Sequence, residues 1–110
     1  TQKMNDTTIV NQIQLSTTEQ IVPVGPDRLI SHIMLANVDT STAYHGIIYL
    51  VPRVRSSTNK IEHVFWYADV PAKSTSVLDL SQTPFRVPNG WSLEAVAEAN
   101  TKLTLNLLGK

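Results

Sequence analysis

The chain has 110 residues, no cysteine and a formal net charge of zero. Hydrophobic residues make up 42% and charged residues 16%, which suits one domain with its own core. The lack of cysteine excludes disulfides, thiolate zinc sites and a cysteine nucleophile. The nine basic residues are scattered, so neither nucleic acid nor an anionic membrane is an expected partner.

We therefore expect a single domain over residues 1–110, in which residues 1–6 form a flexible N-terminal arm. No apolar run approaches the length of a membrane span, and the first residues lack the apolar core of a signal peptide. These features predict a soluble chain that is made without Sec export.

The first half of the chain is a series of short apolar runs separated by turn residues. Residues 7–15 predict an edge strand, and the run 19–24 contains Pro23, which cannot donate to a ladder and suits an edge or a bulge. The expected shared face of the first strand holds Ile9, Asn11, Ile13 and Leu15.

Residues 28–38 form the strongest strand candidate, with apolar side chains on both faces, as in a central strand that is covered on its second side. One predicted face holds Leu29, Ile33 and Leu35, and the other Ile30, Met34 and Ala36. A second buried strand is expected over 43–54, followed by an exposed loop.

The second half predicts an aromatic strand over 62–69, a short hairpin connection and a returning strand over 74–80. Pro88-Asn89-Gly90 then supplies a tight turn that opens a final hairpin. About seven to nine strands without an amphipathic helix indicate an all-β protein, an antiparallel β-sandwich of jelly-roll-like form with no substantial helix.

No pattern for catalysis, cofactor binding or metal binding is found. The three histidines His32, His45 and His63 fall on different predicted strands without ligand spacing. The turn aspartates Asp27, Asp39, Asp69 and Asp79 lack the dense Asp-x-Asp spacing of a calcium loop and are better explained as turn caps. We therefore predict no catalytic residue, no cofactor, no metal and no enzymatic activity.

Aromatic side chains are the remaining candidates for binding. Along a strand, Phe65 and Tyr67 share one face and Trp66 points to the other, so Trp66 is either an outward contact or part of the core. Trp66 and Tyr67 are candidate interface residues. Trp91 is a candidate stacking aromatic, or else it closes one end of the core.

Two arginines alternate with Val54 before a serine-rich loop. Arg53 and Arg55 would project to one side of a strand end, either as solvated edge charges or as contacts to a neighbouring subunit. We include both among the candidate interface residues.

The order of the turn and strand motifs from about Ile21 onward resembles small β-sandwich virion proteins of tailed bacteriophages. These proteins decorate or cement capsids, form head fibres or serve as tail accessory modules. The segments that carry the resemblance are Ile21–Arg28, Leu35–Asn37, Ile48–Pro52, Val70–Ser74 with Leu78–Leu80, and Val87–Leu93.

This resemblance implies a non-enzymatic virion structural protein, made in the bacterial host cytoplasm, that decorates or cements the capsid. The implied partners are further copies of the chain, in a homo-oligomer, and a major capsid or tail protein. The alternative is a tail-associated or receptor-binding carbohydrate-binding module whose exposed aromatics contact a glycan.

Overall fold

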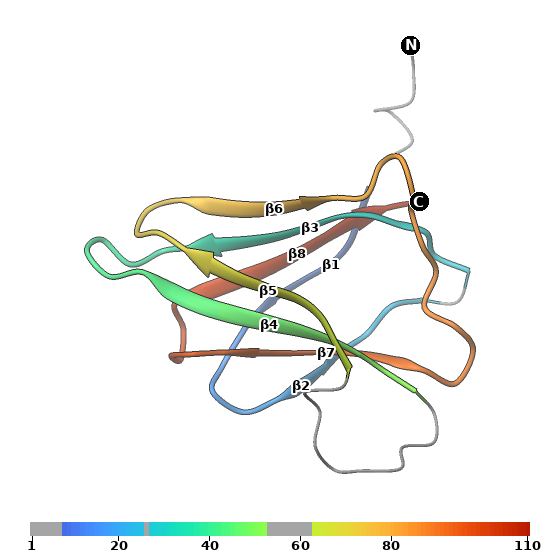
Figure 1. Cartoon of the computed structure of the whole chain (residues 1–110), viewed down its shortest axis with the longest axis horizontal. Helices are drawn as coiled ribbons and strands as arrows, with labels where there is room; N and C mark the ends of the chain where they lie inside the picture. The colour runs from blue at the N-terminus through green and yellow to red at the C-terminus, as the bar shows by residue number, and fades with distance from the viewer. Residues whose placement is uncertain (1–7, 26, 53–62) are drawn as a thin grey trace.

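The computed structural model describes residues 8–25, 27–52 and 63–110. This part of the chain forms eight strands, all paired antiparallel (Figure 1). Among these residues, no helix is long and apolar enough to cross a membrane. The strands are β1 (Thr8–Gln14), β2 (Gln20–Val22), β3 (Ile30–Asn37), β4 (Tyr44–Val51), β5 (Val64–Val70), β6 (Thr75–Asp79), β7 (Ser92–Ala97) and β8 (Leu103–Gly109).

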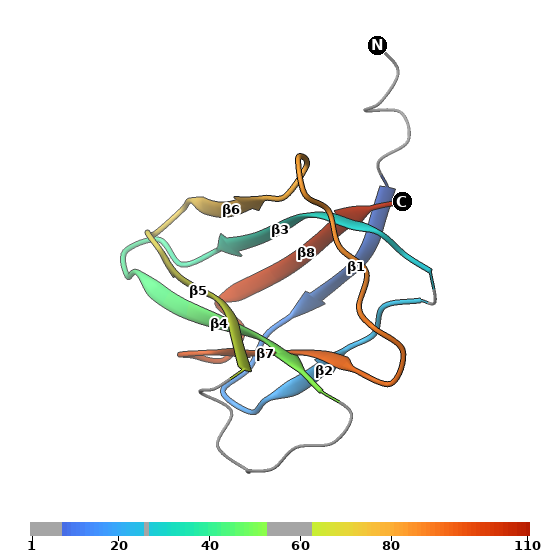
Figure 2. The ribbon, with the colours of Figure 1, turned by 45° about the vertical axis from the view of Figure 1, so that its right-hand side comes forward.

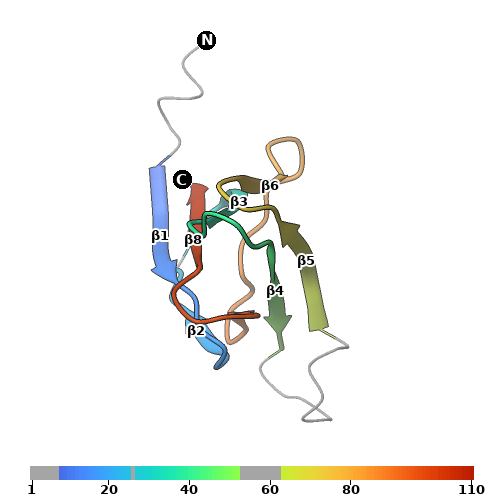
Figure 3. The same cartoon turned by 90° about the vertical axis from the view of Figure 1, so that its left-hand side faces the viewer.

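The strands form two four-stranded sheets with the orders β1-β8-β3-β6 and β2-β7-β4-β5. Figure 3 shows the two layers from the side, with β1 and β8 in one layer and β4 and β5 in the other. The predicted all-β antiparallel sandwich is confirmed, as are the edge positions of β1 and β2 and the interior position of β3 in its sheet.

The pairing of strands is nested: β1 pairs with β8, β2 with β7, β3 with β6, and β4 with β5. Among the eight described strands, only β4 and β5 are both consecutive in the chain and adjacent in a sheet. At each remaining connection the chain crosses from one sheet to the other, and this path can be followed in Figure 2.

The hairpins expected at the end of the chain and around residues 70–73 are therefore wrong. The strands β7 and β8 lie in different sheets, and so do β5 and β6. A period of two tells which side chains face a core, but it does not tell which strand is the hydrogen-bonded partner.

The core lies between the sheets and is almost wholly aliphatic. Each sheet contributes its inward side chains, and most of them are completely buried. The buried cluster consists of Leu15, Val22, Ile30, Ile33, Leu35, Ile48, Ala68, Val70, Leu93, Ala95, Ala97, Leu103, Leu105 and Leu107.

Two β-bulges correct the predicted faces. The register of β1 shifts between Ile9 and Asn11, so Val10 packs against the core while Ile9 is 62% exposed. A shift in β3 after Ile30 likewise brings Ile30 into the core. An inserted residue moves the alternation by one position, which a strict period-two reading does not anticipate.

A polar network closes one end of the sandwich. The amide of Asn37, which is 4% exposed, donates 2.9 Å hydrogen bonds to the carbonyls of Thr42 and Val70. Asp39 accepts a 2.8 Å hydrogen bond from Lys102 Nζ and another from the amide of Thr42. Because Asn37 ends β3 and Val70 ends β5, this network joins the two sheets.

We expect the Asp39 side chain to make the stability of the fold depend on pH. The hydrogen bond from Lys102, with the amide hydrogen bonds of the turn, lowers the pKa of Asp39 well below its ordinary value. Since the folded state has the lower pKa, the stabilisation is present above about pH 4 and is lost as the pH falls toward the folded-state pKa. We expect the free energy of unfolding, measured with urea between pH 2 and 7, to fall at the acidic end.

Two variants test whether Asp39 and Lys102 cause this loss of stability in acid. Asp39→Asn should flatten the acidic part of the curve, and Lys102→Met should also flatten it because it removes the main cause of the lowered pKa. Combining the two substitutions should add little to either. An acidic slope that is unchanged in Asp39→Asn would show that other groups control it.

Gly109 allows β8 to pass close to the chain that enters β3. Leu29 and Lys110 exchange two backbone hydrogen bonds there, at 3.1 and 2.9 Å. A Cβ atom on residue 109 would overlap the carbonyl of Leu29, which is held by this pairing. A side chain at this position therefore requires a shift of the backbone.

We expect Gly109→Ala to lower the free energy of unfolding by about 2–3 kcal/mol, at the upper end of overpacking costs. Gly25→Ala is the matched control, because its Cβ would meet only the flexible side chain of Arg28, at 3.3 Å. Urea denaturation of both variants checks this. Equal stability of the two would contradict the proposed backbone clash.

Candidate functional site

Three of the predicted features lie outside the described residues. These are the N-terminal arm over residues 1–6 and the two candidate interface residues Arg53 and Arg55. The other candidates, Trp66, Tyr67 and Trp91, are described, and they lie in different surroundings.

The aromatic run of β5 is divided between the two faces of its sheet. A register shift opposite Ile48 and Tyr49 makes Phe65 a bulge residue, so Phe65 and Trp66 both pack against the core. Tyr67 points outward and is 52% exposed. The structure thus selects the core alternative for Trp66 and leaves Tyr67 as the exposed aromatic of this strand. The predicted shared face of Phe65 and Tyr67 is wrong, because the bulge moves Phe65 to the core side.

The outer face around Tyr67 is apolar. Tyr67 pairs with Ile47 on β4, and Ile47 pairs in turn with Val96 on β7. Val64 on β5, which pairs with Tyr49 on β4, is the next residue on this face and is 40% exposed. We call the side chains of Ile47, Val64, Tyr67 and Val96 the apolar outer face.

His45 holds Tyr67 in place at one border of this face. The two rings are stacked, with centroids 5.0 Å apart and an angle of 21° between their planes. Glu98 Oε1 lies 3.1 Å from His45 Nδ1 and accepts a 3.0 Å hydrogen bond from the His45 amide. A tyrosine oriented in this way loses less side-chain entropy when it contacts a partner.

Further side chains on the outer face of this sheet are buried, although they do not belong to the core. Tyr49, Val51 and Glu94 are at most 8% exposed, yet all three lie outside the core cluster. Ser92 Oγ donates a 3.2 Å hydrogen bond to Glu94 Oε2. The sequence shows apolar residues on both faces of β4, and this was the available signal that its outer face is not an ordinary solvated one.

Trp91 lies at one end of the sandwich, just before β7. It is 40% exposed and is not one of the buried residues of the core cluster. Its backbone amide donates a 2.9 Å hydrogen bond to the carbonyl of Pro88, which closes the predicted turn. Two hollows of about 200 and 270 Å³ lie against Trp91.

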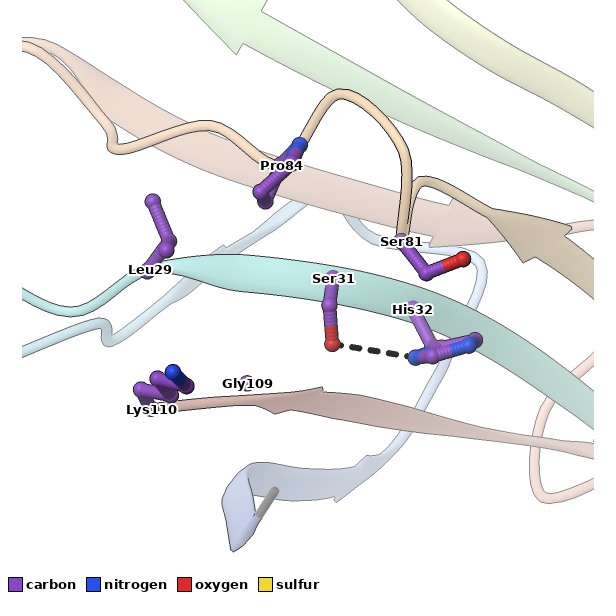
Figure 4. A pocket seen from close by; sticks show the side chains of 7 residues that line it. All are labelled: Leu29, Ser31, His32, Ser81, Pro84, Gly109 and Lys110. Atoms are coloured by element: carbon purple, nitrogen blue, oxygen red, sulfur yellow. Dashed lines mark hydrogen bonds between the residues drawn. The ribbon is translucent and has the colours of Figure 1, made fainter. Parts of the chain in front are cut away.

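A third hollow, of about 220 Å³, is lined by Ser31 and His32, which begin a chain of hydrogen-bonding side chains that the sequence did not predict (Figure 4). Ser31 Oγ lies 3.0 Å from His32 Nδ1, and His32 Nε2 lies 3.3 Å from Asp79 Oδ1. The pairing of β3 with β6 places His32 opposite Asp79. Only the adjacency of Ser31 and His32 is visible in the sequence.

The side chains of Ser31, His32 and Asp79 form interactions with neighbouring parts of the chain. Ser31 Oγ also donates a 3.3 Å hydrogen bond to the carbonyl of Leu108, so its single proton is drawn to the neighbouring strand. Hydrogen bonds from Ser81 lower the pKa of Asp79, and the nearby His32 lowers it further. The arrangement ties the β3 bulge to β6 and β8.

Two of the four turn aspartates act as caps, as predicted. Asp39 accepts backbone hydrogen bonds from Ser41 and Thr42, and Asp79 accepts one from Ser81. His32 and His45 lie in different sheets. Within the described ranges, no group of three or more His, Asp or Glu side chains could hold a metal ion.

The pairing of β4, β5 and β7 therefore forms an apolar outer face. The exposed Trp91 lies apart from this face, beyond the edge strand β2. Comparison with protein-family models, with curated proteins and with solved structures found no match for this chain.

Proposed function

We propose that this chain is a non-enzymatic structural protein of a bacteriophage virion that decorates or cements the capsid. The observation that carries the proposal is the apolar outer face. In a two-layer sandwich, outward side chains are normally polar because they meet water. The outward positions at Ile47, Val64, Tyr67 and Val96 are apolar or aromatic, which suits a protein interface.

The strand order supports the same proposal. Nested pairing of eight strands in the orders 1-8-3-6 and 2-7-4-5 is the arrangement that we expect of a jelly roll. Jelly rolls are common in viral capsid proteins and in lectins. A fold alone does not define a function, so the surface carries more weight here than the topology.

The size of the face favours many weak contacts over one strong one. The three strands β4, β5 and β7, spaced about 4.8 Å apart and about six residues long at about 3.3 Å per residue, cover roughly 300 Å². A stable pair of proteins buries roughly 800 Å² on each partner. One such face is therefore too small for a firm dimer but suits contacts that repeat over a symmetric surface.

The proposed mechanism is additive. A copy made in the host cytoplasm docks on a major capsid or tail protein and contacts neighbouring copies as a homo-oligomer on the particle. Each further contact forms at a high effective concentration once the first has formed. Many modest interfaces can then bridge neighbouring subunits and stabilise the shell.

The exposed Trp91 favours a second candidate function. A carbohydrate-binding module on a tail or receptor-binding protein needs an aromatic surface that is open to solvent, and Trp91 provides one. This function would use a different part of the sandwich from the apolar outer face.

The assembly proposal predicts the behaviour of Tyr67→Glu. A charge at this position, which is 52% exposed, should leave the thermal unfolding midpoint nearly unchanged and weaken particle binding by about tenfold or more. Binding is measured by co-sedimentation of the purified protein with washed particles of the source phage. Val77→Glu is the matched control, because Val77 is 50% exposed on the other sheet.

Particle binding that is equal in the two variants would reject the apolar outer face as the interface. Absence of the native protein from washed virions would reject the virion function itself. These two outcomes separate an error about the surface from an error about the function.

A further inference from the structure

We infer that the end of the sandwich around Trp91 binds a neutral sugar ring; this rests on the second candidate function above and names its site and its class of ligand. The site, here called the Trp91 site, consists of the turn that precedes β7 and the chain that follows β2. Its side chains are Val24, Val87, Asn89 and Trp91, with Ile21 at the border.

The indole is held on a preformed turn. The carbonyl of Pro88 accepts the 2.9 Å hydrogen bond from the Trp91 amide, and Gly90 has a φ of 84°. This left-handed conformation is readily adopted by glycine at the third position of a tight turn. The platform therefore needs little ordering when a ligand arrives.

Two hollows border the indole, and they share part of their lining. Val24, Val87 and Trp91 line both of them. Ile21, which is 64% exposed, lines the smaller hollow, and Asn89 lines the larger one. A ligand on the indole would thus meet aliphatic side chains on one side and a polar side chain on another.

The chemistry of the lining selects a neutral and hydroxyl-bearing ligand. No charged side chain lines either hollow in the described part of the chain. Neither the indole N–H of Trp91 nor the side-chain amide of Asn89 has a hydrogen-bond partner among the described residues. A pyranose presents C–H groups to an aromatic face and hydroxyls to such free donors, whereas a purely aliphatic ligand would leave them unpaired.

The dimensions indicate one or two sugar rings. Each hollow is smaller than the range of roughly 300–1,000 Å³ that is typical of sites for drug-sized ligands. Affinity for a single ring is therefore low. Copies arranged on a particle would strengthen it by simultaneous binding to a glycan-coated surface.

The test uses an array of neutral gluco-, galacto- and manno-oligosaccharides together with sialylated and sulfated glycans. The full chain, displayed as a multivalent fusion, should bind at least one neutral glycan. Trp91→Ala should weaken this binding by about tenfold or more, and Asn89→Ala by about threefold. Tyr67→Ala is the matched control, because it removes the other exposed aromatic and should leave glycan binding unchanged.

Thermal unfolding of each variant shows whether it is folded, and Asn89→Ala tests the site if Trp91→Ala does not fold. Three results would overturn the inference: no neutral glycan bound, binding of charged glycans only, or neutral binding that survives both substitutions. Loss of particle co-sedimentation in Trp91→Ala without any glycan binding would instead identify a protein contact. Because Tyr67→Glu tests assembly separately, the two proposals can fail independently.

Discussion

The whole structure depends on the burial of one face of each sheet against the other. Leu103, Leu105 and Leu107 on β8 are completely buried between the sheets. The two layers approach so closely that a Cβ atom on Gly46 would lie 2.9 Å from Cδ1 of Leu35 in the opposite sheet. Because no disulfide is available, this aliphatic contact and the hydrogen bonds of the ladders hold the domain together.

Because the inner faces of the two sheets form the core, the outer faces and the ends of the sandwich are the surfaces that can contact a partner or a ligand. The outer face of the β1-β8-β3-β6 sheet carries polar pairs beside the exposed Val77: Gln12 donates a 2.7 Å hydrogen bond to Asn106, and His32 lies beside Asp79. The opposite outer face carries Tyr67 and its apolar neighbours. The contiguous apolar neighbours of Tyr67 on three adjacent strands support an interface on this side of the sandwich.

The two proposed surfaces lie toward opposite edges of one sheet. The order β2-β7-β4-β5 places Tyr67 on the edge strand β5, and the Trp91 site borders the other edge strand, β2. A copy that docks through the first surface would keep the second one open. The same sandwich could therefore serve assembly and glycan binding with different residues.

The sequence by itself determined the strands, their turns and the edge position implied by Pro23, because period-two patterns and turn residues are local signals. It also identified Tyr67 and Trp91 as candidates, but it did not determine their exposure. The bulge at Phe65 brought that side chain to the core beside Trp66, and the nested pairing placed β7 and β8 in different sheets. Only the tertiary structure decided these features, because bulges and strand partners depend on contacts between residues far apart in the chain.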